Sequence, residues 1–297
     1  MGVSVLVKNL VKVYRLDSIE VQALRGLNME VEEGEVVSII GPSGSGKTTL
    51  LNIIGGLSRA TAGVVRVGDV EVTSLDENRL IEYRRRTVGH IFQTLNLIPT
   101  LTAAENIELP MIALRVPRGE RARRVRELLE IVGLEDRASH KPGELSGGEQ
   151  QRVAIAAALA NDAPLILADE PTGELDTANA RMIVNYLLKV NREMGKTIIM
   201  VTHDPTVARE ADRILKIEDG VIKASLTPTQ ISEGERAVTF IDQIRIRMSD
   251  LNAELERLEE DLKVGRISGD EYFEKRRSIM ETLRVYREEL HRLGVVS

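Results

Sequence analysis

The apolar residues of the N-terminal three quarters of the chain fall into short runs separated by amphipathic stretches. Residues 3–7 alternate between apolar and polar side chains, which predicts a strand with one buried face, and residues 11–14 continue that character. Three compact runs, at residues 36–40, 165–168 and 197–201, are apolar almost throughout, which is typical of strands buried on both faces. Because helix-like segments separate these runs, we expect an α/β core with parallel strands.

Two longer segments between the runs have helical patterns. Residues 178–194 favour one helix, and residues 74–138 favour mostly helical structure. Proline interrupts helices, so breaks are expected within the second segment at Pro99, Pro110 and Pro117.

The pattern changes after residue 228, and this predicts two domains, 1–228 and 229–297. Ser268 and Glu271 form a capping-box pattern that begins a second helix after an interruption at residues 265–269. We expect a hairpin of two antiparallel helices. The apolar positions of the first helix are Ile241, Ile244, Met248, Leu251, Leu255, Leu258 and Leu262. Those of the second are Ile279, Leu283, Tyr286, Leu290 and Leu293.

Composition and charge exclude several functions. The chain of 297 residues is 42% hydrophobic, which is enough for a sizeable core, and has a net charge of −6 with no basic block, so we expect no nucleic-acid partner. The absence of cysteine excludes disulfides and thiolate metal sites. No run approaches the roughly 20 apolar residues of a membrane helix, and the N-terminus lacks a signal peptide's apolar core. We therefore expect a soluble chain whose membrane-spanning partner, if it has one, is another protein.

A glycine-rich loop follows the first buried run and fits the pattern G-x-x-x-x-G-K-[ST]. Its backbone N–H groups and the following helix start can surround a phosphate. Lys47 can reach the β- and γ-phosphates, and the Thr48 hydroxyl can bind Mg²⁺. A glycine-rich turn without a ligand is the alternative, which the strand before the loop and the helix after it disfavour. The loop comprises Gly41, Pro42, Ser43, Gly44, Ser45, Gly46, Lys47 and Thr48.

Two carboxylates end the second buried run. Asp169 can hold Mg²⁺ through water, and Glu170 can act as general base on the attacking water. Adjacent residues of a strand point in opposite directions, so the two carboxylates can divide these tasks. A strand that ends in a polar turn is the alternative.

A second anion-binding helix start is predicted at Ser146, Gly147 and Gly148, where Ser146 can cap an alanine-rich helix. This start has no acid pair of its own. It is therefore useful if it faces the ATP of a second copy, whereas a flexible loop with a helix cap is the alternative.

The stretch at residues 145–152, Leu-Ser-Gly-Gly-Glu-Gln-Gln-Arg, resembles the signature motif of ABC transporter ATPases, and the glycine-rich loop resembles their Walker A motif. Further family motifs follow in family order over residues 3–224. They are Tyr14, which resembles the aromatic residue that stacks on adenine; Gln93, the Q-loop glutamine; Asp169 and Glu170, the Walker B acid and catalytic glutamate; Leu175 and Asp176, the D-loop; and His203, the switch histidine.

This resemblance implies a P-loop fold of ABC ATPase type: a mixed sheet, an antiparallel β subdomain and a helical subdomain that carries the signature. It implies ATP and Mg²⁺ as cofactors, a homodimer with two ATPs between the copies, and an integral-membrane permease as partner at the inner face of the cell membrane. The implied catalytic residues are Glu170, His203, Lys47 and Gln93, and the implied metal ligands are Thr48, Gln93 and Asp169. The implied nucleotide contacts are Tyr14, Ser43, Gly44, Ser45, Gly46, Lys47, Thr48, Thr49, Ser146, Gly147, Gly148, Glu149 and Asp176.

A narrower resemblance involves residues 92–102 and 105–110, which are similar to ATPases of the lipoprotein-release, macrolide-export and cell-division group. In that group the ATPase transmits mechanical work to a permease of four membrane helices with a large outer domain. The sequence departs from the family at Glu174, where a small or amide residue is more frequent, and this puts the coupling between the two ATP sites in doubt.

Three alternatives for function remain open: the ATPase subunit of a transporter, a soluble ABC ATPase of repair or translation type, and a scaffold that uses ATP only to dimerise. Three roles also remain open for the hairpin. It can be a packed cap on the ATPase, an additional dimerisation element, or a docking element for another protein.

Overall fold

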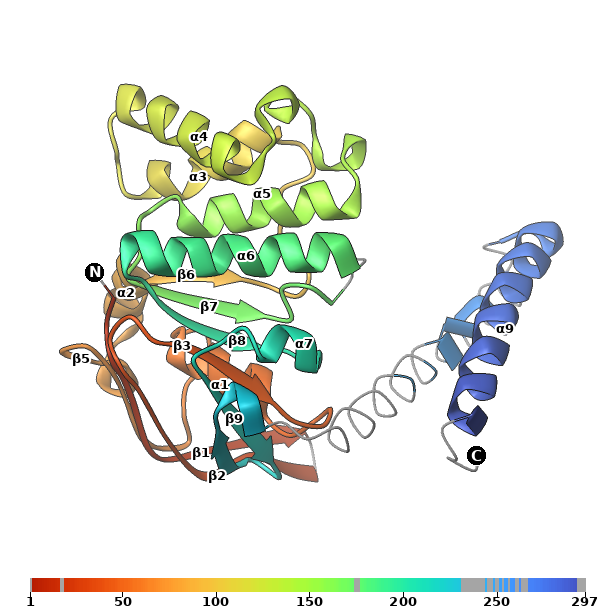
Figure 1. Ribbon diagram of the computed structural model, residues 1–297, viewed down its shortest axis with the longest axis horizontal. Helices are drawn as coiled ribbons and strands as arrows, with labels where there is room; N and C mark the ends of the chain where they lie inside the picture. Colours follow the sequence, from red (N-terminus) through yellow and green to blue (C-terminus); the bar gives the residue numbers. More distant parts are fainter. Residues whose placement is uncertain are drawn as a thin grey trace. The chain divides into compact units, whose positions relative to one another are not determined.

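The computed structural model describes residues 2–16, 19–173, 177–230 and 267–292, together with positions 244, 248, 251, 252, 254, 255, 257–259 and 262. The chain forms two compact units, Met1–Ile231 and Ser232–Ser297 (Figure 1). Among the described residues no helix is both long enough and apolar enough to cross a membrane.

The larger sheet of the first unit has six strands in the order β10-β9-β3-β8-β7-β6. All neighbours are parallel except β10, which runs antiparallel to β9. The three compact apolar runs form central strands, as the sequence predicts, and every residue of these strands is buried. The strands are β3 (Val36–Ile40), β6 (Val88–Ile91), β7 (Leu165–Asp169), β8 (Thr197–Val201), β9 (Arg213–Glu218) and β10 (Val221–Leu226).

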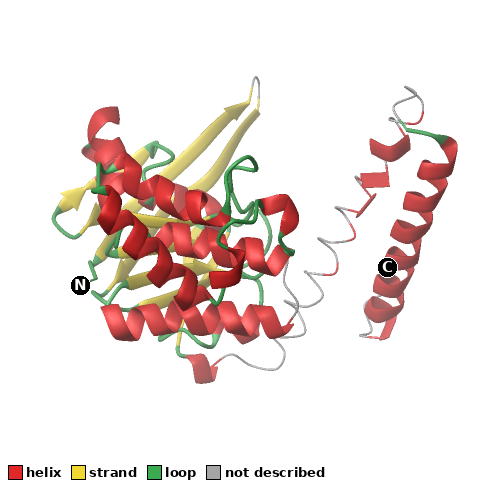
Figure 2. Ribbon diagram, turned by 90° about the horizontal axis from the view of Figure 1, so that it is seen from above, coloured by secondary structure: helices red, strands yellow, loops and turns green. Residues whose placement is uncertain are grey.

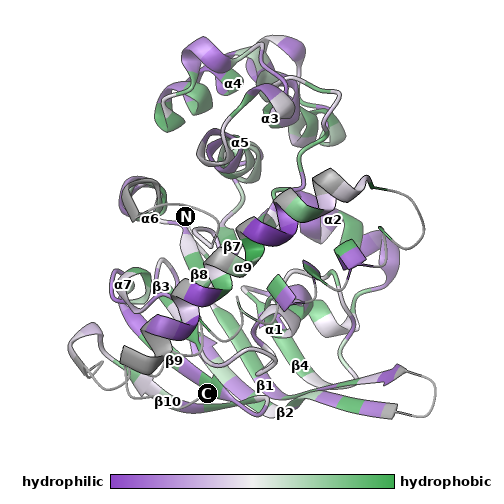
Figure 3. Cartoon of the chain, turned by 90° about the vertical axis from the view of Figure 1, so that its right-hand side faces the viewer, coloured by the Kyte–Doolittle hydropathy of each residue, from purple (hydrophilic) through white to green (hydrophobic). Residues whose placement is uncertain are grey.

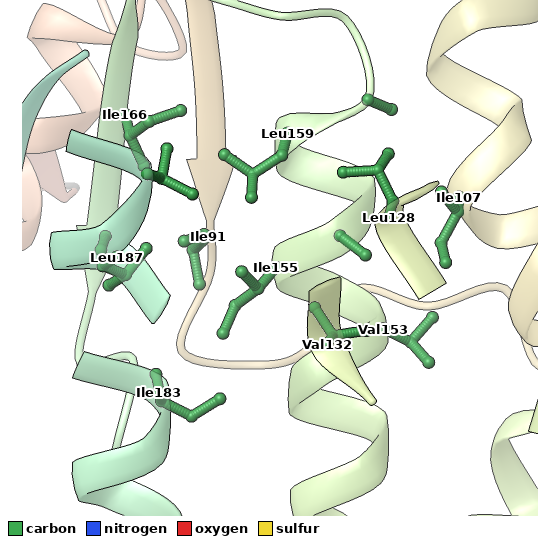
Figure 4. Close-up of a cluster of buried hydrophobic side chains, with 14 of the residues drawn as sticks. Ile91, Ile107, Leu128, Val132, Val153, Ile155, Leu159, Ile166, Ile183 and Leu187 are labelled. Atoms are coloured by element: carbon green, nitrogen blue, oxygen red, sulfur yellow. The ribbon is translucent and has the colours of Figure 1, made fainter. Parts of the chain in front are cut away.

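Alternate residues of the central strands contribute to two separate cores. In β7, Leu165 and Leu167 join one cluster, whereas Ile166 and Ala168 join the other. Figure 4 shows the cluster that contains Ile166, whose side chain faces side chains of α5 (Gly147–Leu159) and α6 (Thr177–Met194). The first cluster fills the space between the sheet, α1 and the antiparallel strands. The sheet is therefore covered on both faces, which agrees with its apolar sequence.

A second, antiparallel sheet has the strand order β2-β1-β4-β5. Hydrophilic and hydrophobic bands alternate along its long β1–β2 ribbon, as Figure 3 shows. The two short N-terminal strand patterns form one strand, whose pairing shifts register beyond Val7 near Asn9, a residue with φ of 49°. The strands are β1 (Val5–Leu16), β2 (Ile19–Val31), β4 (Ala62–Val67) and β5 (Val70–Glu71).

Helices lie over the large sheet in Figure 2, and in Figure 1 α3 and α4 lie beyond α5. The helices are α1 (Lys47–Ile54), α2 (Glu77–Thr87), α3 (Ala103–Ala113), α4 (Arg118–Val132), α5 (Gly147–Leu159), α6 (Thr177–Met194), α7 (Pro205–Ala208) and α9 (Gly269–Arg292). Short 3-10 turns occur at η1 (Val72–Ser74), η2 (Glu135–Arg137), η3 (Pro142–Glu144) and η4 (Pro228–Gln230).

The expected break at Pro110 is wrong, because α3 continues through this residue. Ile107 and Met111 flank the proline and are buried, so their packing outweighs the one hydrogen bond that the proline removes. The strand β6 also interrupts the region that the sequence predicts as mostly helical.

The second unit contains α9, and its described positions between residues 244 and 262 are also helical. Leu251 and Leu258 form one buried cluster with Tyr272, Ile279 and Leu283 of α9. The hairpin prediction for Ile241, Leu290 and Leu293 concerns side chains outside the described residues.

Candidate functional site

The glycine-rich loop connects β3 to α1 and requires glycine at two positions because neighbouring backbone is close. A Cβ on Gly46, whose φ is 101°, would lie 2.5 Å from the carbonyl oxygen of Ala23. A Cβ on Gly41 would lie 2.1 Å from the carbonyl oxygen of Ile217. These contacts hold the loop against both sheets and aim the start of α1 at the space a phosphate would occupy.

Polar groups inside this loop are suited to an anion. The Lys47 ammonium is buried and donates to the carbonyl oxygens of Gly41 and Pro42 at 2.8 and 2.9 Å. Burial lowers the pKa of Lys47, while the carboxylates of Glu170 and Asp169 oppose that shift. The buried Ser45 hydroxyl oxygen has no hydrogen-bond partner among the described residues. Ser43 is exposed and Thr49 is half-buried on the first turn of α1.

The two residues predicted to hold Mg²⁺ lie together. The Thr48 hydroxyl donates to Asp169 Oδ1 at 3.2 Å, across from α1 to the end of β7. Burial raises the pKa of Asp169, and the Thr48 hydrogen bond and Lys47 oppose the shift. A hydroxyl and a carboxylate are hard oxygen donors, so these residues fit Mg²⁺ that keeps its other ligands from water and phosphate.

The residue after Asp169 adopts an unusual backbone conformation. Glu170 has φ of 51°, a left-handed value that costs non-glycine residues energy, and its N–H donates to the carbonyl oxygen of Val201 at 2.9 Å. The Glu170 carboxylate accepts a hydrogen bond from His203 Nδ1. This hydrogen bond raises the pKa of His203, whereas burial lowers it to a smaller extent.

Sequence patterns place Glu170 and His203 near the same phosphate, but they do not predict this direct contact. The signal is that β7 and β8 are neighbouring parallel strands, which end at the same edge of the sheet. His203 follows β8 as Glu170 follows β7. The next residue, Asp204, caps α7, and its carboxylate accepts a hydrogen bond from the Thr206 N–H at 2.7 Å.

Two further predicted site residues, Tyr14 and Gln93, are exposed. Tyr14 is 38% exposed on β1, with the Lys12 ammonium 4.7 Å from its ring centre. Gln93 lies in an exposed loop after β6, preceded by His90 and Phe92, whose rings stack 4.1 Å apart. Within the described residues, Gln93 makes no hydrogen bond to Thr48 or Asp169.

The predicted second anion site is the start of α5. Ser146 caps this helix: its hydroxyl oxygen accepts from the Glu149 N–H at 3.4 Å, while a Glu149 carboxylate oxygen accepts from the Ser146 N–H at 2.8 Å. Arg137 pairs with the same carboxylate at 3.1 Å. The Ser146 N–H, the Ser146 hydroxyl and Arg137, in that order, lower the pKa of Glu149 to about 2.

Glu149 therefore closes the cap of α5, a role that the sequence pattern S-x-x-E could have predicted. A Cβ on Gly147 would meet no atom within 4 Å, so the approach to this helix start is open in the single chain. The D-loop residues Glu174, Leu175 and Asp176 lie outside the described residues.

A covered parallel sheet, a phosphate loop and a separate capped helix start define a P-loop nucleotide-binding protein. The family model described as ABC transporter matches residues 24–173, and the chain belongs to this family as one of its ATP-binding proteins. The family prediction and the predicted fold class are thereby confirmed.

Several known proteins are similar to this chain. An uncharacterized ABC transporter ATP-binding protein of Thermotoga maritima is 54% identical over 212 residues, which cover 71% of this chain and 90% of the relative. The macrolide export ATP-binding/permease protein MacB of Burkholderia lata is 48% identical over 69% of this chain, but the match covers only 30% of MacB.

The solved dimeric structure of the ATP-binding cassette MJ0796, in a post-hydrolysis state bound to ADP and Pi, matches with a TM-score of 0.72 and 46% identity. The match covers 75% of this chain and 98% of that one. MJ0796 comes from Methanocaldococcus jannaschii.

Proposed function

We propose that this chain hydrolyses ATP as a head-to-tail homodimer and that the cycle drives a separate membrane permease. The proposal rests on a difference between the N-termini of α1 and α5. The start of α1 lies beside Lys47, Asp169 and Glu170. Among the described residues, the start of α5 presents backbone N–H groups and the Ser146 hydroxyl, and the Glu149 carboxylate there is held by the helix cap. A phosphate-binding surface without a metal-binding acid is useful when it faces a nucleotide held by another copy.

The residues of the α1 site divide the chemistry among them. The loop N–H groups and Lys47 bind the phosphates, and Thr48 and Asp169 bind Mg²⁺, which supplies charge neutralisation on the β- and γ-phosphates. Glu170 accepts a proton from the attacking water, and its hydrogen bond to His203 fixes the carboxylate in position. The raised pKa of His203 favours a protonated imidazole beside the γ-phosphate.

The remaining predicted residues act when two copies close. Tyr14 stacks on the adenine, and Ser146, Gly147 and Gly148 of one copy bind the γ-phosphate held by the other. Gln93 completes the metal site from its exposed loop and couples it to the permease. Asp176 lies outside the described residues, and its place at the interface is proposed from the family resemblance alone. The dimeric structure of the similar MJ0796, bound to ADP and Pi, supports an assembly of two copies.

The permease is proposed to belong to the export or mechanotransmission group, because MacB is among the similar proteins. Most of MacB lies outside the match. The ATPase would lie at the inner face of the membrane through its permease partner. Transporter relatives favour this function over a repair ATPase or an ATP-dependent scaffold.

The test is the variant Glu170→Gln, which keeps the shape of the side chain but cannot take up a proton at neutral pH. We expect ATP with Mg²⁺ to convert this variant into a stable dimer on size exclusion, whereas ADP does not. A variant that hydrolyses ATP at the wild-type rate would show that Glu170 is not the general base. Absence of ATP-dependent association would contradict the ATP sandwich, which is the homodimer with two ATPs between the copies.

A further inference from the structure

Two large apolar side chains of α9 are exposed in the described part of the second unit. Tyr272, Ile279 and Leu283 are buried in the hairpin cluster, but Phe273 is 67% exposed and Met280 is 39% exposed. The two exposed residues are seven positions apart, which is about two helical turns, so they lie on the same side of the helix.

Three arginines continue the same side of α9. From Phe273, steps of four, three, four and three residues reach Arg277, Met280, Arg284 and Arg287. All three arginines are exposed, and Arg284 Nε lies 3.1 Å from a carboxylate oxygen of Glu288 on the same helix. We call Phe273, Arg277, Met280, Arg284 and Arg287 the arginine stripe.

The preceding segment of the hairpin carries the opposite charge. Residues 250–261 contain six acidic residues and only one basic residue, Arg257. Leu251 and Leu258 are buried in the cluster with α9, whereas Glu254 and Glu259 are exposed. The carboxylates of Glu254 and Glu259 are therefore accessible to a second copy.

We propose that the arginine stripe packs against the acidic segment of a second copy's hairpin, in a symmetric pair that forms without ATP. Two-fold symmetry makes each contact occur twice, with the stripe of either copy on residues 250–261 of the other. The four helices then form a bundle in which Phe273 and Met280 leave water and the arginines face carboxylates. Two arginine stripes facing each other would instead repel.

Exposed apolar surface and charge both favour a second copy as the occupant. Five buried side chains form the hairpin cluster among the described residues, and pairing would add Phe273 and Met280 to the buried apolar surface. An anionic lipid surface would attract the stripe but repel residues 250–261 of the same hairpin. Paired hairpins would keep two ATPase units at high effective concentration after hydrolysis has opened the ATP sandwich.

The first experiment is sedimentation velocity of the full chain without nucleotide. We expect a concentration-dependent dimer, and we expect Phe273→Glu with Met280→Glu to raise its Kd at least about tenfold. Lys275→Glu is the control, because Lys275 is exposed on another side of α9. A wild-type chain that stays monomeric throughout, or a double variant that associates normally, would overturn the proposal.

The second experiment tests the occupant by charge exchange. Arg284→Glu with Arg287→Glu should weaken association, and adding Glu254→Arg with Glu259→Arg should restore it. Failure of the four-fold variant to associate would show that the stripe does not meet residues 250–261. If the arginine variants remain as associated as wild type but lose binding to phosphatidylglycerol vesicles, the occupant is a membrane and the proposal is wrong.

The proposal goes beyond the ATP-driven dimer and is separable from it. Association without nucleotide tests the hairpin, whereas ATP-dependent association of Glu170→Gln carrying the Phe273→Glu and Met280→Glu changes tests the sandwich alone. Loss of nucleotide-independent association would contradict the hairpin pairing alone, and loss of ATP-dependent association would contradict the ATP-bridged dimer alone.

Discussion

The helix starts of α1 and α5 both present backbone N–H groups, but their surroundings differ. At α1, a buried ammonium, a hydroxyl–carboxylate pair and the Glu170–His203 pair surround the loop. At α5, the carboxylate of Glu149 is already bound by its own cap and by Arg137. We therefore propose that the start of α1 performs the chemistry and that the start of α5 only binds.

This difference explains why the chain is expected to work as a pair. A carboxylate without a local partner at the start of α5 would weaken nucleotide binding there, because it would repel the phosphates. The Glu149 carboxylate is instead paired with groups of its own cap and with Arg137. These contacts stabilise its ionised form and lower its pKa to about 2.

Removing the general base should have the largest effect. Glu170→Gln should lower kcat by a factor of about 10² to 10⁴, because proton transfer from water loses its acceptor. Steady-state phosphate release measures this. Glu210→Gln, the same change at an exposed position away from the site, is the control. A kcat within a factor of about two of the wild-type value would show that Glu170 is not the general base of ATP hydrolysis.

Removing the phosphate-binding ammonium should come next. Lys47→Ala should weaken ATP binding by about 1.5–3 kcal/mol, the usual worth of a hydrogen bond to a charged group, or roughly 10- to 150-fold in Kd. The substitution also leaves the Gly41 and Pro42 carbonyl oxygens without their donor. Equilibrium titration with a fluorescent ATP analogue measures the effect, and an unchanged Kd would contradict the assignment.

A matched pair of cap variants separates stability from binding. Thr102 caps α3 with the same capping box as Ser146 caps α5. Thr102→Ala and Ser146→Ala should each lower the free energy of unfolding by about 1 kcal/mol in chemical denaturation. Only Ser146→Ala should also weaken the ATP-dependent association of the Glu170→Gln protein. Equal loss of association in both variants would mean that the α5 start acts only through stability.

The smallest effect concerns pH. The pKa of Glu149 is depressed from 4.5 to about 2, so its cap contributes stability that is present above about pH 4.5 and is lost as pH falls towards 2. Glu149→Gln should therefore show less loss of stability than wild type over that interval. Thermal unfolding at stepped pH measures it, and identical pH profiles would show that the carboxylate does not hold the cap.

Local pattern predicts the parts of this site that depend on contiguous residues. Apolar runs predict β3, β7 and β8, and the glycine spacing predicts the loop at α1. Patterns fail where distant segments decide the outcome. Pro110 remains inside α3 because its neighbours are buried, and the β1 strand passes through a register shift near Asn9 because β2 and β4 pair with it on both sides.

The Glu170–His203 contact also depends on segments that are distant in the sequence. Neither residue's neighbours in sequence encode that β7 and β8 are adjacent, and the left-handed backbone of Glu170 is a consequence of how the chain turns between sheet and loop. The loop glycines show the reverse case. Sequence spacing locates Gly46, but only the approach of Ala23 explains why a side chain is excluded there.

If each ATP site combines α1 of one copy with α5 of the other, two inactive variants should complement each other in mixed dimers. Lys47→Ala disables the first half, and Gly147→Asp places a repelling carboxylate at the second, in a position where a Cβ meets no neighbouring atom. Each variant alone should be inactive. If the sites are shared, mixing the two variants restores ATPase activity, because half of a mixed dimer's sites combine an intact α1 with an intact α5. If each site lies within one chain, the mixture remains as inactive as its components, and the account is wrong.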